Sequence, residues 1–309
     1  MAQQTILDES GEYRITLHEA EQKNDALIIT FAGQPGEMAN SGFGTNFSLS
    51  RGYDTVYVAQ KFETHFQGLD LDQFRNAIVP LMDGRRIVCY GSSLGAYAAL
   101  YYGSSIDCHI LAGAPMLPSW PGFDRPKYRD LARNHVPLSE LPRRTVAPVI
   151  LTDPYEPNDV SYMKSAIRPA FQDARIIMLP FAGHTLLNTL DQAKLLVPAA
   201  VTFFETGDFP DVTLPTEGFA SWHLNFGKSL MRKREWLTAY EHGKKAFSLR
   251  RDLGAASLLM ISLDGLGDYT AIRNFVSQTL TPEEQGKFFK GAKNLARIHE
   301  RALKNDSTL

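Results

Sequence analysis

Residues 86–103 read RIVCYGSSLGAYAALYYG, and this stretch decides how the rest of the chain is interpreted. Its first five residues are rich in apolar and β-branched side chains, which predicts a buried strand. The glycines and serines that follow predict a tight turn, and the small residues of 94–102 predict a helix that packs closely on a sheet. Ser93 therefore lies between Gly91 and Gly95, where a strand passes into a helix.

The alternation of strand and helix continues on both sides of this stretch. Helical spacing of apolar residues is found at 69–82, 94–102, 160–171 and 185–204. Strand-length apolar runs are found at 26–31 (ALIITF), 55–59 (TVYVA), 86–90 (RIVCY), 108–112 (CHILA), 148–152 (PVILT) and 175–179 (RIIML). Because these runs are continuous rather than alternating, we expect strands covered on both faces. The sequence predicts an α/β fold with a mostly parallel sheet and flanking helices.

Two long segments do not fit short connections between a strand and a helix. Residues 33–54 are rich in Gly, Ser and Asn, and residues 115–147 contain Pro, Trp and Arg. Such segments either shape a binding site or only pack on the surface of the fold. Their aromatic residues fit an acyl or sugar pocket as well as they fit packing within the loops; these are Phe43, Phe47, Trp120 and Phe123.

The composition changes after residue 207. Residues 208–216 contain Pro and Thr as linkers do, and residues 217–309 carry helical patterns without a strand-like run. We therefore expect a domain at 1–207, a linker, and a helical C-terminal domain at 217–309. Two similar pieces, 234–249 and 267–280, loosely resemble tetratricopeptide-like repeats, and the alternative is a plain helical extension.

Charge and composition narrow the partners and the compartment. The 32 Lys and Arg residues are balanced by 34 Asp and Glu residues, which argues against binding to nucleic acid or to an anionic membrane. The start of the chain lacks the features of a secretory signal, and no apolar run is long enough to span a membrane. Cys89 and Cys108 lie in strand-like runs, so we expect buried thiols in a cytoplasmic protein, or a disulfide if the strands are neighbours.

Ser93 is a candidate nucleophile because of its place in the turn. In a G-x-S-x-G turn the serine hydroxyl points outward, and side chains two residues away on either side would collide with the backbone. Ser92 does not fit this frame. The alternative is a Gly-Ser turn without catalytic function. A serine hydroxyl needs a base to take its proton and a third group to orient that base.

Residues 13–204 resemble the α/β-hydrolase superfamily in this motif and in the order of the later polar residues. The resemblance implies that the acid follows one late strand and the histidine the next. Gly183-His184 follows the run at 175–179 and resembles the histidine loop of the family, which makes His184 the expected base rather than a capping or solvated histidine. The acid is expected among Asp159, Asp153 and Glu156, in that order of preference; Asp159 also fits a helix cap, and Asp153 fits backbone hydrogen bonds within its loop.

The resemblance also implies an oxyanion hole made by backbone amides. Leu94 directly follows the nucleophile, and Gln34 lies in a loop, Phe31 to Gly36, that is similar to the His-Gly-x loop of the family. Ala32 departs from the His or Gly found there in many relatives. No metal ion or organic cofactor is required by this chemistry.

These residues imply a serine hydrolase that acts on an ester or related acyl compound, such as a small-molecule or saccharide ester. An acyltransferase would use the same groups and pass the acyl group to another acceptor. A third hypothesis is a non-catalytic interaction protein on a hydrolase fold, with the helical region binding a protein partner or a second copy of the chain.

Overall fold

The computed structural model describes residues 3–22, 24–142 and 145–305. By its internal contacts the chain divides into two compact units, Met1–Thr213 and Leu214–Leu309. We call them the sheet unit and the helical unit. The division lies within residues 208–216, the segment whose composition is typical of a linker. Each unit is described separately below.

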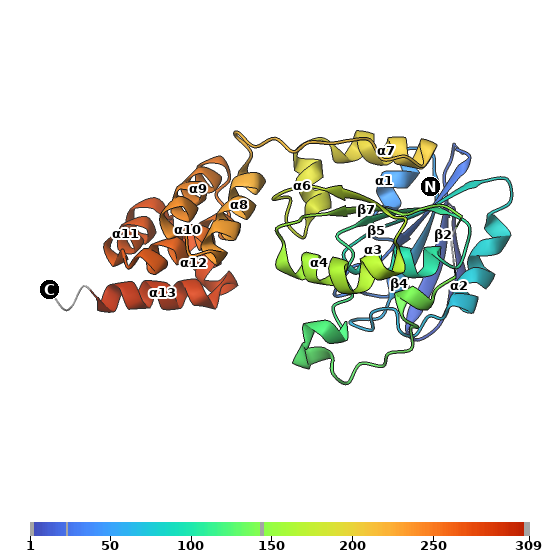
Figure 1. Ribbon diagram of the computed structural model, residues 1–309, viewed down its shortest axis with the longest axis horizontal. Helices are drawn as coiled ribbons and strands as arrows, with labels where there is room; N and C mark the ends of the chain where they lie inside the picture. The colour runs from blue at the N-terminus through green and yellow to red at the C-terminus, as the bar shows by residue number, and fades with distance from the viewer. Residues whose placement is uncertain (1–2, 23, 143–144, 306–309) are drawn as a thin grey trace. The chain divides into compact units, whose positions relative to one another are not determined.

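The sheet unit is built on eight strands in the order β1-β2-β4-β3-β5-β6-β7-β8. Strands β3 to β8 run parallel, whereas β2 pairs with β4 and with β1 in the antiparallel sense. This confirms the predicted α/β fold with a mostly parallel sheet and flanking helices (Figure 1). The strands are β1 Gln3–Glu9, β2 Tyr13–Glu19, β3 Ala26–Phe31, β4 Asp54–Gln60, β5 Arg86–Ser92, β6 His109–Gly113, β7 Val149–Thr152 and β8 Arg175–Met178.

The six apolar runs of the sequence correspond to β3 to β8, and the first two strands were missed. β1 forms the edge of the sheet and most of its side chains are exposed, so that it carries no apolar run. In β2, buried positions alternate irregularly with half-buried polar ones such as Arg14. Neither strand therefore gives the continuous apolar run that is typical of a strand covered on both faces.

Helices cover both faces of the sheet (Figure 1). They are α1 Thr45–Leu49, α2 Leu71–Ile78, α3 Leu94–Gly103, α4 Pro157–Tyr162, α5 Arg168–Ala170, α6 Leu186–Gln192 and α7 Leu196–Thr206, with short 3-10 turns at Val79–Leu81, Pro121–Phe123, Pro126–Tyr128 and Leu138–Glu140 and a π turn at Met163–Ile167. The helix expected at 185–204 is two helices, because the chain turns at Lys194, whose φ is positive. All ten residues of α3 are buried, as its small side chains allow.

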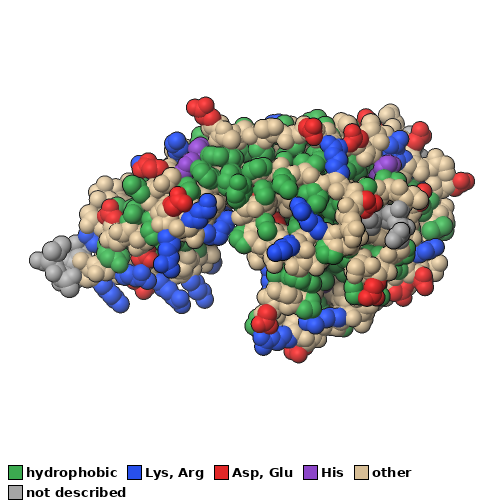
Figure 2. Space-filling view, viewed as in Figure 1, with side chains coloured by type: hydrophobic (Ala, Val, Ile, Leu, Met, Phe, Trp, Pro, Cys, Tyr) green, Lys and Arg blue, Asp and Glu red, His purple; other side chains and the backbone are tan. Residues whose placement is uncertain are grey.

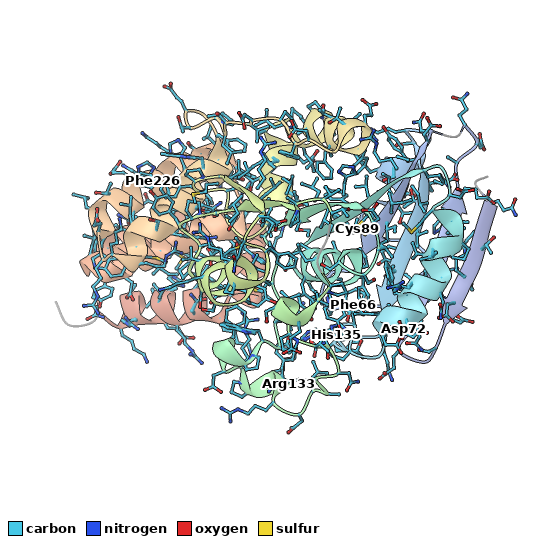
Figure 3. The ribbon with its side chains drawn as sticks, turned by 45° about the vertical axis from the view of Figure 1, so that its right-hand side comes forward. Phe66, Asp72, Cys89, Arg133, His135 and Phe226 are labelled. Carbon is cyan, nitrogen blue, oxygen red and sulfur yellow. The ribbon has the colours of Figure 1, made fainter. Side chains whose placement is uncertain are left out.

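Aromatic side chains fill the core on both faces. On the face of α2 and α3, Tyr102 stacks on Phe31 with ring centroids 5.9 Å apart and lies 4.9 Å from Phe74. His135 joins this cluster beside Phe66 (Figure 3), and its Nε2 lies 2.9 Å from the Phe66 carbonyl oxygen. On the other face, Phe204 of α7 lies 5.6 Å from Tyr90 of β5.

The two cysteines are buried and unlinked, with their sulfur atoms 3.7 Å apart. Within the described ranges, none of the helices is both long enough and apolar enough to cross a membrane. Acidic and basic side chains are interspersed on the visible face of the sheet unit (Figure 2).

The helical unit has its own core. Its helices are α8 Ala220–Arg232, α9 Trp236–Leu249, α10 Leu253–Leu266, α11 Tyr269–Asn274, α12 Pro282–Gly291 and α13 Lys293–Lys304, with a π turn at Phe275–Thr279. Glycines permit close packing here, since a Cβ on Gly227 of α8 would lie 2.4 Å from the Leu258 side chain of α10. The two similar pieces of sequence form α9 and α11 with its π turn.

Phe204→Ala should destabilise the sheet unit by about 3 to 5 kcal/mol, because the side chain is fully buried among Tyr90, Tyr53 and Phe47 and its loss leaves a cavity. Phe62→Ala is the matched control, since Phe62 is 63% exposed and its loss should cost less than about 0.5 kcal/mol. Urea denaturation followed by circular dichroism measures both. Equal effects of the two substitutions would contradict this packing.

Candidate active site

Ser93 joins β5 to α3 in a backbone conformation that is rare for a residue with a side chain. Its φ is 54° and its ψ is −117°. Two hydrogen bonds hold it there: its N–H donates to the Gly113 carbonyl at 2.8 Å, and its carbonyl accepts from the Met116 N–H at 3.1 Å. The end of the neighbouring strand β6 and the residues just after it therefore fix the turn. Strained backbone of this kind costs about 1 to 3 kcal/mol and is concentrated at functional sites.

The glycines on either side of Ser93 are required by close backbone contacts. A Cβ on Gly91 would lie 2.1 Å from the Gly95 carbonyl oxygen, and a Cβ on Gly95 would lie 2.8 Å from the Phe31 carbonyl oxygen. Real Cβ atoms essentially never approach other atoms below 3.0 Å. The second contact also shows that the end of β3 lies against the first turn of α3. As the spacing of the motif indicated, a side chain at Gly91 or Gly95 would collide with nearby backbone atoms.

The structure brings three of the expected site residues into one hydrogen-bonded chain. Ser93 Oγ lies 2.7 Å from His184 Nε2, and His184 Nδ1 lies 2.7 Å from Asp159 Oδ1. His184 follows β8 and precedes α6, whereas Asp159 lies in the first turn of α4, which follows β7. The three side chains therefore come from the carboxyl ends of parallel strands, where sites of open α/β sheets lie.

The carboxylates after β7 have different surroundings. Asp159 is 1% exposed and contacts His184. Asp153 is not part of this chain: its oxygens accept hydrogen bonds from the N–H groups of Tyr155 at 2.9 Å, Phe181 at 3.1 Å and Gly183 at 2.7 Å. Of the two alternatives for Asp153, backbone hydrogen bonding is therefore the one observed, and it fixes the residues that precede His184. Glu156 occupies the N-cap position of α4, immediately before Pro157, without a capping hydrogen bond from its side chain.

The charges around His184 favour its protonated form. Burial of the imidazole lowers its pKa, but the hydrogen bond and the charge of Asp159, together with the charge of Glu156, outweigh burial. The pKa of His184 is consequently raised above the ordinary value of histidine, although the positive charge of Arg125 opposes this. A base of this kind holds a proton strongly once it has taken it from a hydroxyl.

Two backbone amides near Ser93 are candidates for binding an oxyanion. Leu94 is the first residue of α3, so its N–H has no acceptor within the helix. Gln34 lies in the loop after β3, and in the described part of the chain its N–H makes no hydrogen bond. The Gln34 side chain is anchored elsewhere: its Nε2 donates to Tyr128 Oη at 2.6 Å and lies 2.9 Å from His65 Nε2. The Ala32 N–H is engaged with Val58, at 2.9 Å.

Some aromatic residues of the segments 33–54 and 115–147 pack in the core, and others lie at a cavity. Phe43 packs on Tyr90 at 4.9 Å and Phe47 on Phe204 at 6.0 Å, so both belong to the packing of the core. Trp120 lines a cavity of about 370 Å³, and Phe123 packs against it with ring centroids 5.0 Å apart. Sequence reasoning did not single out Arg125, because a long segment without periodicity gives no sign of which side chains turn inward.

Comparisons with known proteins give only distant likenesses. No family model and no curated protein matches the sequence. An esterase from Thermogutta terrifontis with bound propionate is 13% identical, with a TM-score of 0.44 over 68% of this chain and 96% of that one. The capsule O-acetyltransferase of Neisseria meningitidis serogroup A is 16% identical, with a TM-score of 0.43 over 64% and 91%. A Thermus thermophilus protein is 15% identical, with a TM-score of 0.42 over 66% and 97%.

Asp159→Asn should lower the pKa of His184, because it removes the largest influence that raises this pKa. Glu156→Gln should lower it less, since Glu156 acts on the imidazole through its charge alone. NMR titration of the His184 ring protons measures both changes without reference to any activity. An unchanged His184 pKa in Asp159→Asn would contradict the contact. Only a neutral imidazole can accept a proton, so any activity that depends on Ser93 and His184 should rise with pH through this pKa, and its acidic limb should move to lower pH in Asp159→Asn.

Proposed function

We propose that the sheet unit is a serine hydrolase that cleaves an ester or a related acyl compound. The observation that carries the proposal is the hydrogen-bonded chain from Ser93 Oγ through His184 to Asp159, with both contacts at 2.7 Å. A serine hydroxyl, an imidazole and a buried carboxylate in this order are the groups that nucleophilic acyl transfer requires.

In the proposed reaction, Ser93 Oγ attacks the carbonyl carbon of the ester while His184 Nε2 takes its proton. Asp159 holds the imidazole so that Nε2 faces the serine, and its charge stabilises the imidazolium that forms. The Leu94 and Gln34 amides would bind the oxygen that becomes negative, and one such donor is typically worth about 3 to 4 kcal/mol in the transition state. His184 then gives the proton to the leaving alcohol, which leaves an acyl group on Ser93.

The acyl group leaves Ser93 by the same steps in reverse. His184 removes a proton from an incoming hydroxyl, and that hydroxyl attacks the acyl carbon. Water as the incoming group completes hydrolysis, whereas an alcohol or sugar hydroxyl completes acyl transfer. The two reactions share Ser93, His184 and Asp159, and they differ in which acceptor the site admits.

A fluorophosphonate probe should label the native protein and fail to label Ser93→Ala, because the probe reacts with an activated serine oxygen. Ser92→Ala is the matched control: it removes the adjacent hydroxyl, which lies outside the turn, and labelling should persist. Labelled protein is quantified by intact mass. Equal labelling of native protein and Ser93→Ala would reject Ser93 as the nucleophile.

Hydrolysis of 4-nitrophenyl acetate should slow by at least about 10³-fold in Ser93→Ala, as is typical when the nucleophile of such a triad is removed. A polyol added to the native enzyme separates the two fates of the acyl group. A rise in acetylated polyol with a matching fall in acetate identifies a transferase, and acetate as the sole product identifies a hydrolase.

A further inference from the structure

The long segment at 115–147 carries an arginine-rich cavity into the neighbourhood of the proposed active site. A cavity of about 220 Å³ is lined by Arg125, Arg129 and Arg133, with Asp124 as the one carboxylate among its lining residues. Three positive charges against one negative charge give these lining residues a net charge of +2. Arginine binds carboxylate and phosphate oxygens through pairs of parallel hydrogen bonds, so such a space favours an anion.

Two of these arginines have no counter-ion among the described residues. Arg129 pairs with Asp124 at 3.2 Å, and Lys127 of the same segment pairs with Glu63. The carbonyl of Arg125 accepts a hydrogen bond from the Tyr128 N–H at 3.1 Å, but the side chains of Arg125 and Arg133 make no ion pair or hydrogen bond within residues 3–22, 24–142 and 145–305. Arg125 is half-buried, and its guanidinium lies 4.7 Å from the centroid of the Phe123 ring. A half-buried cation that is not neutralised by the protein is well placed to pair with a ligand.

The arginine cavity lies close to the reacting groups. The charge of Arg125 is near enough to His184 to lower the pKa of its imidazole. The same segment also meets the proposed oxyanion loop, since Tyr128 accepts a hydrogen bond from the Gln34 side chain at 2.6 Å. Tyr128 lines the arginine cavity. Tyr128 thus connects the cavity with the proposed oxyanion loop, while Ser93, His184 and Asp159 themselves are not among the residues that line it.

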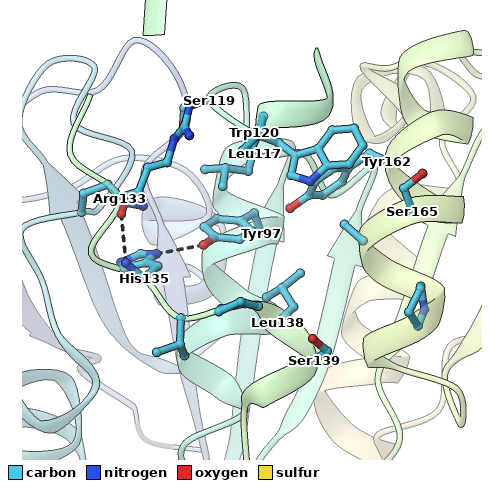
Figure 4. Close-up of a pocket in the computed structure, with 16 residues that line it drawn as sticks. Tyr97, Leu117, Ser119, Trp120, Arg133, His135, Leu138, Ser139, Tyr162 and Ser165 are labelled. Carbon is cyan, nitrogen blue, oxygen red and sulfur yellow. Dashed lines mark hydrogen bonds between the residues drawn. The ribbon is translucent and has the colours of Figure 1, made fainter. Parts of the chain in front are cut away.

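A second, larger cavity of about 370 Å³ is shown in Figure 4. It shares the lining residues Ser119, Trp120, Pro121 and Arg133 with the arginine cavity. Two of the residues that line it lie close in sequence to the proposed site residues. Tyr97 lies one helical turn after Ser93, and Tyr162 one turn after Asp159. Most of its lining is apolar or aromatic.

The larger cavity has a single permanent charge among its described lining residues, which is that of Arg133. His135 also lines it, but burial lowers the pKa of His135 to about 4, so that the ring is neutral near pH 7. Its Nδ1 lies 2.9 Å from Tyr97 Oη, and its ring stacks on Tyr101 with centroids 4.0 Å apart. The two cavities together thus offer an apolar space with a cationic end.

We propose that the ester processed at Ser93 carries an anionic group, a carboxylate or a phosphate, which Arg125 and Arg133 bind while an apolar part of the substrate occupies the larger cavity. This rests on the proposed function, since it names the class of substrate that the same site takes. Esters with a positive charge are disfavoured, because they would approach two guanidinium groups without counter-ions.

The test compares esters that differ in charge. Phenyl acetate is the neutral reference, 4-acetoxybenzoate and 4-acetoxyphenyl phosphate place the anion on the leaving group, and the monophenyl ester of succinic acid places it on the acyl group. At least one anionic ester should have a kcat/KM about tenfold or more above that of phenyl acetate, mostly through a lower KM, because the arginines bind substrate and transition state alike. The carboxylate and phosphate arms identify the preferred anion.

Arg125→Gln and Arg133→Gln should each reduce the ratio of anionic to neutral kcat/KM by about tenfold or more, because each removes a hydrogen bond to a charged group. Arg125→Lys should retain part of the preference, and added salt should weaken it. Arg75→Gln is the matched control: it removes the same charge from α2, lines neither cavity, and should leave the ratio unchanged.

Binding is measured separately so that failure of the reaction does not hide the result. Calorimetry on Ser93→Ala should show tighter binding of the anionic esters than of phenyl acetate, and loss of this difference in Ser93→Ala that also carries both Arg→Gln substitutions. Equal binding of neutral and anionic esters, or a preference that survives both substitutions, would overturn the assignment of the arginines. Undiminished ester hydrolysis by Ser93→Ala would overturn the proposed function instead, and the binding difference would still decide the role of the arginines.

Discussion

The site depends on two backbone hydrogen bonds that hold Ser93 in a strained conformation. The Gly113 carbonyl at the end of β6 and the Met116 N–H just after it bind the backbone of Ser93. Strands β5 and β6 must therefore be paired in register before the turn can form. Gly91 and Gly95 allow the backbone to come close enough for this arrangement. The position of the Ser93 hydroxyl thus depends on the pairing of two parallel strands, and the local G-x-S-x-G motif alone does not set it.

The loops at the carboxyl ends of β7 and β8 show how similar residues take different tasks. Asp159 faces His184, while Asp153 gathers three amides that include Gly183, next to His184 in the chain. Burial raises the pKa of Asp153, and the backbone hydrogen bonds from these amides oppose this effect. One carboxylate therefore orients the imidazole directly, and the other fixes the loop on which the imidazole is carried.

Sequence reasoning succeeded where a pattern has a direct physical cause. Continuous apolar runs predicted β3 to β8, because strands covered on both faces are mostly apolar. The expectation of full coverage was wrong for β8, which is the edge strand of the sheet and has Met178 53% exposed. Sequence reasoning missed β1, whose side chains are mostly exposed, and β2, in which the buried polar residues Thr16 and His18 interrupt the apolar run. It ranked Asp159 above Asp153 as the acid but could not decide between them. The decision depends on whether the N–H groups of residues 181 and 183 point toward Asp153, which the sequence does not show. Arg125 and Arg133 gave no signal, because nothing in the sequence of 115–147 tells which arginines lack a partner.

The separate cores of the two units bear on how the stability of this chain must be described. Phe204 and its neighbours belong to the first unit, whereas Leu258, Leu259 and Phe288 pack in the second. Cooperative unfolding is a property of a single core, so one midpoint need not describe both units. Trp120 lies in the first unit and Trp222 and Trp236 in the second, which means that the intrinsic fluorescence of the whole chain sums two melting curves. The signal of Trp120 has to be separated from that of Trp222 and Trp236 before a melting temperature is assigned to either unit.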